Sequence, residues 1–145
     1  MTKIYAERYH DISCGHRVVN QGGKCEHLHG HNYRIHFKVE ATLDDKGMVL
    51  DFSVIKEQLC EWLEECWDHR TLIYDKDPWL SALITIDPSI VTVPFNPTAE
   101  NIARYLLEMV GPMALHDHPN VKLVSVFVEE TRKCSASAEL CDSDD

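Results

Sequence analysis

The sequence lacks several features that would point to whole classes of protein. It has no run of 18 or more apolar residues, which excludes a membrane-spanning helix. The residues after Met1 include no apolar stretch typical of a secretory signal, so a cytoplasmic location is expected. Basic residues are few, with 14 Lys and Arg against 24 Asp and Glu and a formal net charge of −10. This deficit argues against nucleic acid as a partner, because contacts with phosphates rely on a basic surface.

Length and composition predict one soluble domain. A chain of 145 residues is long enough for one ordinary core and too short for two domains. Its hydrophobic share of 44% and charged share of 26% are typical of globular proteins, and no internal repeat or low-complexity linker divides it. We expect the domain over residues 1–141 and an acidic, disordered tail over residues 142–145. The six cysteines are expected to be reduced thiols, since no export signal accompanies them.

The spacing of apolar residues predicts strands, then two helices, then strands. Helical spacing covers residues 52–67, and a second helix is expected to start at Asn96-Pro97-Thr98 and to stop at Gly111-Pro112. Residues 73–96 give no clear pattern apart from a short strand at residues 90–93. The order predicts an α+β domain with an antiparallel four-stranded sheet and both helices on one face. Alternating spacing predicts these strands: residues 3–18, 31–41, 121–131 and 134–140.

One short stretch concentrates a thiol and three imidazoles on alternate positions: Cys25, His27, His29 and His31. In an extended strand, alternate side chains point to the same face. A strand rises about 3.3 Å per residue, so Cys25 and His31 would lie roughly 20 Å apart, too far to share one ion. Neighbouring positions, roughly 6.6 Å apart, can share a metal. The candidates are therefore His27 with His29, or His29 with His31, plus a third ligand from elsewhere, with Cys25 left for another role. A polar strand with surface histidines is the alternative.

A series of short motifs runs through the chain in a fixed order. They are His16, Cys25-x-x-x-His29-Gly30-His31, Gly47-Met48-Val49-Leu50-Asp51-Phe52, Asp68-His69, Pro97-Thr98-Ala99-Glu100-Asn101 and Glu130-Thr131. Together they resemble the 6-pyruvoyl-tetrahydropterin synthase superfamily, most closely its 6-carboxy-5,6,7,8-tetrahydropterin synthase branch, over most of residues 3–140. The three residues between Cys25 and His29 look like the carboxy-forming branch, because animal pyruvoyl enzymes usually have five there. Cys14-Gly15 departs from the two alanines that relatives often carry before the first histidine.

The resemblance implies a zinc site made by His16, His29 and His31, and so decides against His27 as a ligand. Three neutral histidines leave a fourth coordination position open, as catalytic rather than structural zinc sites do. A non-enzymatic zinc-binding module is a separate alternative, in which Cys25 or His27 closes the site as the fourth ligand.

The resemblance also implies a catalytic group formed by Cys25, Asp68, His69 and Glu130. Cys25 would act as the base, and Lys24 beside it favours the thiolate. His69 would transfer the proton, and Asp68 would orient His69. Glu130 would hold the pterin ring, because a carboxylate accepts two parallel N–H hydrogen bonds. In the sequence, Glu130 continues an alternating series of valines, and a carboxylate in line with buried residues calls for a partner.

The reaction implied by the resemblance converts 7,8-dihydroneopterin triphosphate into 6-carboxy-5,6,7,8-tetrahydropterin, acetaldehyde and triphosphate, a step toward 7-deazaguanine and queuosine precursors. A 6-pyruvoyltetrahydropterin synthase, which keeps the side-chain carbons of the same substrate, is the nearest alternative. The resemblance further implies the tunnelling fold, in which the sheets of three chains join into a barrel and two such trimers stack as a homo-hexamer. In that assembly Cys25 would lie beside the metal of its own chain, while Asp68 and His69 would reach the site from a neighbouring chain.

Overall fold

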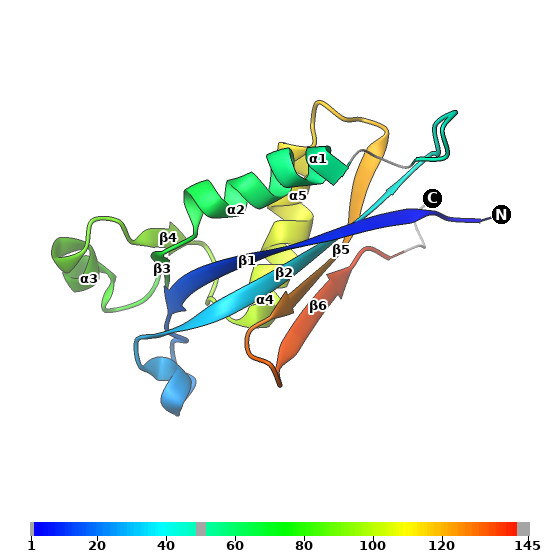
Figure 1. Cartoon of the computed structure of the whole chain (residues 1–145). Coiled ribbons are helices and arrows are strands. Elements are labelled where there is room, and N and C mark those ends of the chain that lie inside the picture. Colours follow the sequence, from blue (N-terminus) through cyan, green and yellow to red (C-terminus); the bar gives the residue numbers. More distant parts are fainter. Residues whose placement is uncertain (1, 49–51, 142–145) are drawn as a thin grey trace.

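The computed structural model of the chain describes residues 2–48 and 52–141 (Figure 1). In this part of the chain the strands form one six-stranded sheet in the order β4-β3-β1-β2-β5-β6. The tail predicted over residues 142–145 and the middle of the motif at 47–52 lie outside the described residues. The strands are β1 (Tyr5–His16), β2 (His29–Ala41), β3 (Arg70–Tyr74), β4 (Val91–Val93), β5 (Val121–Glu129) and β6 (Ser135–Glu139).

The sheet is mixed, so the prediction of a four-stranded antiparallel sheet is wrong. Strands β1, β2, β5 and β6 are antiparallel neighbours, as predicted. Strand β3 adds to β1 in parallel, with Arg70 opposite Cys14, and β4 adds to β3 in parallel at the short strand expected near residues 90–93. Strand β3 escaped prediction because it is short and because Leu72 and Ile73 are both buried, which removes the alternation of a half-buried strand.

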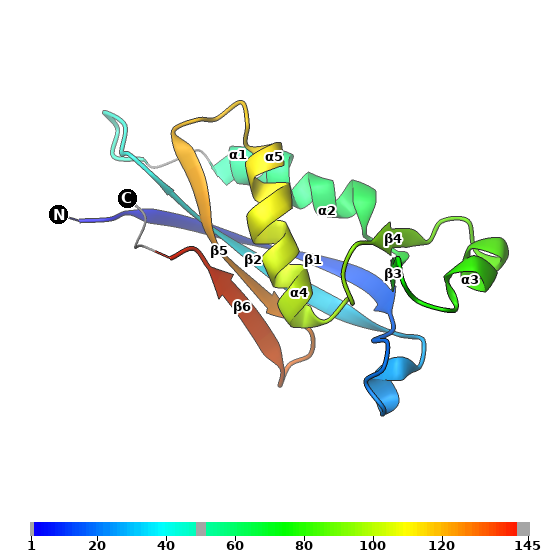
Figure 2. The same ribbon diagram turned by 180° about the vertical axis from the view of Figure 1, so that it is seen from behind.

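Two long helices pack against the sheet, and each contains a π-helical turn. The first confirms the helix predicted over residues 52–67, and the second lies across β5 and β6 (Figure 2). Among the described helices, none combines the length and apolar character needed to cross a membrane. The helical segments are α1 (Phe52–Ile55), η2 (Lys56–Cys60) and α2 (Glu61–Cys66) in the first helix, α4 (Ala99–Tyr105), η3 (Leu106–Val110) and α5 (Gly111–Ala114) in the second, and α3 (Leu80–Ile86) between β3 and β4.

The second helix was predicted to stop at Gly111-Pro112. That prediction is wrong, because the helix continues to Ala114. Its predicted start is confirmed at Thr98, whose hydroxyl accepts a hydrogen bond from a backbone amide of the first turn at 3.1 Å. Gly111 lies where the helix meets β5, and a Cβ atom there would overlap Cδ2 of Leu123. The glycine therefore permits close packing rather than ending the helix, and only Gly111 separates Pro112 from the π-helical turn η3.

The core lies between the two helices and one face of the sheet. Alternate residues of β2 are at most 2% exposed: Tyr33, Ile35, Phe37 and Val39. They form one cluster with apolar side chains of both helices, which confirms that the helices cover one face. Each buried apolar side chain of this size stabilises the fold by about 1.5–3 kcal/mol. Because His29 and His31 share the odd numbering of these core residues, they lie on the covered face at the beginning of β2.

Candidate metal centre

The pairing of β1 with β2 gathers three histidines. His16, the last residue of β1, lies directly opposite His29, the first residue of β2, and His31 follows on the same face. The chain before His29 is not an extended strand, because Lys24–Glu26 form a short 3-10 helix, η1. The predicted alternation therefore holds only for the last two of its positions, His29 and His31.

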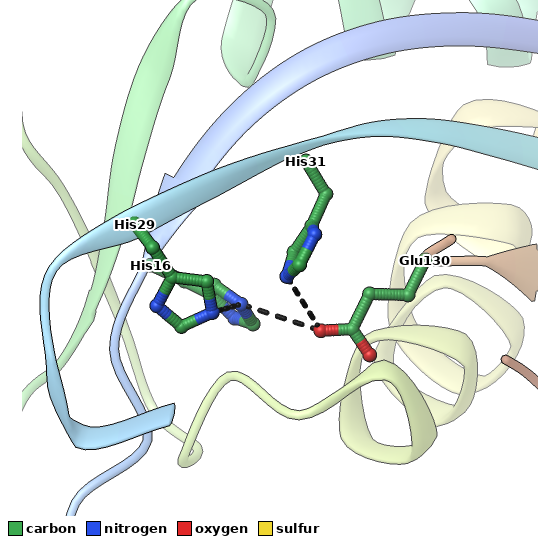
Figure 3. A group of neighbouring side chains, drawn as sticks. All are labelled: His16, His29, His31 and Glu130. Carbon is green, nitrogen blue, oxygen red and sulfur yellow. Dashed lines mark hydrogen bonds and ion pairs between the residues drawn. The ribbon is translucent and has the colours of Figure 1, made fainter. Parts of the chain in front are cut away.

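The three imidazoles and Glu130 form one cluster (Figure 3). Nε2 of His16 lies 3.1 Å from Nε2 of His29. Oε1 of Glu130 lies 2.9 Å from Nε2 of His31 and 3.4 Å from Nε2 of His16. One potential ligand atom from each of the four residues lies within 4.8 Å of all the others. Within residues 2–48 and 52–141, this is the one group of such side chains close enough to hold a metal ion.

Two of the imidazoles form hydrogen bonds with groups outside the cluster, and these bonds determine which ring nitrogen faces the centre of the cluster. Nδ1 of His16 donates to the carbonyl oxygen of Pro97, and Nδ1 of His29 donates to the carbonyl oxygen of His27, both at 2.6 Å. A carbonyl oxygen only accepts, so each neutral ring carries its proton on Nδ1 and a lone pair on Nε2. Two such lone pairs at 3.1 Å repel each other unless a cation binds them both.

His31 provides a second sign of a metal site. Its Nε2 is buried and forms no hydrogen bond, although Oε1 of Glu130 is 2.9 Å away, so that approach lacks the direction of a hydrogen bond. A buried polar atom without a partner costs about 1–3 kcal/mol, unless another group binds it. Burial lowers the pKa of His31, which keeps the ring neutral and its lone pair available. Neutral imidazoles beside a carboxylate are a donor set for a divalent transition metal, so the residues present fit a metal ion.

Tyr33 is a candidate site residue that sequence reasoning missed. Its hydroxyl lies 3.3 Å from each ring nitrogen of His16, and its ring meets the ring of His31 edge-on at 5.6 Å. Burial raises the pKa of Tyr33, so the hydroxyl stays protonated. In the sequence, Tyr33 could have been recognised as a site residue because it lies two residues after His31, on the same face of the strand. The alternating pattern alone, however, predicts only that Tyr33 belongs to the core.

Glu130 finds its partner in the histidine cluster. It follows β5 and continues the alternation of Val126 and Val128, which are both fully buried. Interactions with the imidazoles of His16 and its neighbours hold the pKa of Glu130 below its usual range, despite burial. Figure 3 shows the second carboxylate oxygen pointing away from the imidazoles. The binding of a pterin by Glu130 stays a prediction.

Asp68 and His69 form a hydrogen-bonded pair. The carboxylate of Asp68 accepts one hydrogen bond from the amide of Ser13 at 2.8 Å and another from Nδ1 of His69 at 2.7 Å. Burial raises the pKa of Asp68, but these two hydrogen bonds outweigh burial and leave the pKa below its usual range. His69 has a φ of 60°, which is uncommon outside glycine, and its side chain is 80% exposed. An exposed imidazole oriented by an ionised carboxylate is the arrangement of a base and its orienting group.

A cavity of about 920 Å³ joins these parts, with His31, Asp68, His69 and Glu130 among its lining residues. Cys25 is not among them, and it lies in η1 between β1 and β2. The predicted base–orienter pair therefore shares one cavity with His31 and Glu130, whereas the thiol of Cys25 is close enough to Tyr33, the neighbour of His16, to contribute to the raised pKa of its hydroxyl.

Packing beside His16 accommodates the unusual Cys14-Gly15 pair. Cys14 is buried, its thiol donates to the carbonyl oxygen of Trp67 at 3.4 Å, and burial raises its pKa to about 12. Gly15 faces β3, where a Cβ atom would lie 2.6 Å from Oγ1 of Thr71. Glycine therefore lets β1 and β3 approach closely at the residue next to His16.

Comparison with known proteins assigns the chain to a family. The family model described as 6-pyruvoyl tetrahydropterin synthase matches residues 5–141. The chain belongs to the 6-pyruvoyl tetrahydropterin synthase family. This membership confirms the resemblance drawn from the motifs and the expectation of an enzyme. The matched range includes the histidine cluster, the Asp68-His69 pair and Cys25.

Relatives of this tetrahydropterin synthase family member cover between 73% and 97% of the chain. The 6-carboxy-5,6,7,8-tetrahydropterin synthase of Rickettsia typhi is 34% identical over 134 residues, 90% of this chain and 96% of the relative. The protein of that name from Haemophilus influenzae is 32% identical over 115 residues, 73% and 79% of the two chains. An uncharacterized protein from Wolinella succinogenes has a solved structure with a TM-score of 0.83 at 26% identity, covering 96% of this chain and 99% of that one. The 6-pyruvoyl tetrahydropterin synthase of Caenorhabditis elegans shares the fold, with a TM-score of 0.70 at 24% identity, covering 97% and 98%.

Proposed function

We propose that the chain is a zinc-dependent 6-carboxy-5,6,7,8-tetrahydropterin synthase that works in the cytoplasm on the route to queuosine precursors. Its substrate is 7,8-dihydroneopterin triphosphate, and its products are 6-carboxy-5,6,7,8-tetrahydropterin, acetaldehyde and triphosphate. The observation that carries the proposal is the convergence of three imidazoles beside a cavity lined by the Asp68-His69 pair: His16 and His29 present lone pairs on Nε2, and Nε2 of His31 is buried without a hydrogen bond. The names of the two bacterial relatives support the choice of product.

His16, His29 and His31 hold the zinc ion in this proposal. The carbonyl oxygens of Pro97 and His27 keep two of these rings in the tautomer that presents Nε2, and such outer hydrogen bonds strengthen metal binding. A bound zinc ion supplies a Lewis acid beside the side chain of the substrate. The neutral state of His31 favours the same role, because a protonated imidazole cannot be a ligand.

Glu130 recognises the pterin ring. Its lowered pKa keeps the carboxylate ionised, so it accepts hydrogen bonds from the amino group and a ring N–H of the pterin. The oxygen that points away from the imidazoles is oriented to take part in this contact (Figure 3). The cavity volume of about 920 Å³ is within the usual range for sites of small molecules, so it accommodates a pterin with a phosphorylated side chain.

Cys25 and the Asp68-His69 pair move the protons. Cys25 acts as the base at the side-chain carbons of the substrate, His69 transfers the proton, and Asp68 holds the imidazole in place. Because the side chain of His69 is 80% exposed, we propose that the complete site combines residues of two chains, with Cys25 beside the metal of its own chain and the Asp68-His69 pair supplied by a neighbour.

A homo-hexamer built from two trimers provides such shared sites. Strands β4 and β6 are the edges of the sheet, and an edge strand can pair with another chain. The face of the sheet away from the helices also carries exposed aromatic rings, with Tyr9 49% and Phe127 36% exposed. Exposed aromatic surface of this kind favours association.

The deciding experiment is incubation of the purified protein with 7,8-dihydroneopterin triphosphate and identification of every product by mass spectrometry. The proposal expects 6-carboxy-5,6,7,8-tetrahydropterin together with acetaldehyde, and neither with a His29→Ala control. Formation of 6-pyruvoyltetrahydropterin without acetaldehyde would assign the alternative reaction. An unchanged substrate in the presence of a zinc-loaded protein would leave only the non-enzymatic zinc-binding module.

A further inference from the structure

Arg17 is a buried cation beside His16 that has no part in the proposed chemistry. The residue is 5% exposed, and so is its partner Asp77. Nε of Arg17 donates to Oδ2 of Asp77 at 2.6 Å, and Nη2 donates to Oδ1 at 2.9 Å. Removing two charges from water costs several kcal/mol per ion, so a buried pair adds little net stability. The pair therefore calls for a further explanation.

The remaining donor of Arg17 reaches the segment that contains Cys25. Nη1 donates to the carbonyl oxygen of Glu26 at 3.0 Å. The amide of Val18, the next residue, donates to the carbonyl oxygen of Cys25 at 2.7 Å. The guanidinium carbon also lies 3.5 Å from the centre of the Trp79 ring, close enough for a cation–π contact. Arg17 thus joins η1 to the segment that precedes α3.

The same segment sets the orientation of His29. The amide of His27 donates to the carbonyl oxygen of Lys24 at 3.1 Å, which closes η1. The carbonyl oxygen of His27 accepts the hydrogen bond from Nδ1 of His29 at 2.6 Å. A shift of η1 would therefore move both the thiol of Cys25 and the acceptor that fixes the tautomer of His29.

We propose that Arg17, together with Asp77 and Trp79, is a positioning residue that fixes the Cys25 segment against the end of β1 and thereby orients His29. Arginine suits this task because its planar group donates in several fixed directions at once, whereas lysine presents a single flexible ammonium. The expected effect on turnover rests on the proposed function of Cys25. The expected effects on backbone exchange and on zinc binding do not.

The test compares Arg17→Lys with Arg104→Lys. Arg104 is a matched control, because it pairs with Glu108 on the surface with its side chain 71% exposed. In the folded Arg17→Lys protein, hydrogen exchange of the Val18 and His27 amides should accelerate at least about tenfold, the scale of one lost charge-assisted hydrogen bond. Affinity in a titration with Zn²⁺ should fall about 10–100-fold. The kcat should fall about 10²-fold with KM nearly unchanged, because misplacement of a reacting group reduces the chemical step. The control should change none of these.

Unchanged exchange at Val18 and His27 in folded Arg17→Lys protein overturns the proposal. So does equally faster exchange throughout the sheet, which would make Arg17 a structural residue only. If Arg17→Lys does not fold, Trp79→Leu keeps the ion pair with Asp77 and removes only the ring contact. The same two amides should then exchange about threefold faster, and unchanged exchange overturns the proposal. If the wild-type protein turns over no pterin, the proposed function fails while the exchange and zinc measurements still decide the role of Arg17.

Discussion

Zinc affinity should fall when His29 is replaced by alanine and should stay nearly unchanged when His27 is replaced. His29→Ala removes one of the four donor atoms that lie within 4.8 Å of one another. His27→Ala removes a side chain that is not part of this cluster. The backbone of His27 does contribute, because its carbonyl oxygen accepts from Nδ1 of His29 at 2.6 Å, but alanine retains that carbonyl.

The size of the difference follows from the donor count. Structural zinc sites bind with about 10–16 kcal/mol, so each of four donors contributes on the order of 2.5–4 kcal/mol. At about 1.4 kcal/mol per factor of ten, His29→Ala should weaken zinc binding about 10²–10³-fold. His27→Ala should leave the affinity within about threefold, since substitutions away from buried contacts usually change free energies by about 0.5 kcal/mol or less.

Competition with a chromophoric zinc chelator at neutral pH measures both affinities, and metal content after dialysis checks them. A thermal unfolding series with added zinc gives an independent reading. At about 100 times its dissociation constant, zinc stabilises a protein that binds it by about 2.7 kcal/mol, and His29→Ala should lose this gain. Loss of zinc in His27→Ala with retention in His29→Ala would refute the ligand assignment, and so would equal losses in both.

Four further outcomes test the other assignments. Cys25→Ala should fold and retain zinc but lose about 10²–10⁴-fold in turnover, and more than a tenth of wild-type product formation would remove the thiol from proton transfer. Glu130→Gln should weaken pterin binding by about 1.5–3 kcal/mol, because its amide replaces an acceptor with a donor; a calorimetric affinity equal to wild type contradicts the contact. Inactive Cys25→Ala and His69→Ala chains should regain activity when refolded together, whereas mixed oligomers, verified by mass, that stay inactive would show that each chain has a complete site. The lowered pKa of Asp68 means that its carboxylate stabilises the fold above pH 3.8 and loses this effect as the pH falls through the folded-state value. The difference in unfolding free energy between wild type and Asp68→Asn should therefore shrink below that pH, and a constant difference in a pH series of denaturant titrations speaks against the pair.

Alternation along a strand predicted part of the site from sequence. The shared face of His29 and His31 follows from the pleat, and the helix over residues 52–67 follows from its apolar spacing. Alternation failed at Cys25, because local backbone hydrogen bonds, supported by one from Arg17 to Glu26, hold that segment as a short 3-10 helix rather than a strand. His16 joined the predicted site only through the family resemblance, since its register opposite His29 is a tertiary feature that no local pattern encodes.

Contacts between distant segments were harder still to predict. Arg17 and Asp77 are 60 residues apart, and the segment around Asp77 shows no periodic pattern. Strand β3 was missed because burial on both faces hides the alternation. The position of Gly111 suggested a helix end, but only the nearby Leu123 side chain reveals that the glycine serves packing.

The connection between β1 and β2, from His16 to His29, tolerates insertions that β2 itself does not. Residues near the tip of this connection are exposed and include two left-handed positions, Asn20 with a φ of 62° and Gly22 with a φ of 84°. Extra residues inserted there lengthen a surface loop, and doubling a loop costs only about 0.6 kcal/mol. One residue inserted after His31 would instead turn every later side chain of β2 to the opposite face. An insertion at the exposed tip of this connection therefore leaves His29 and His31 in register with the core face of β2, whereas an insertion within β2 does not.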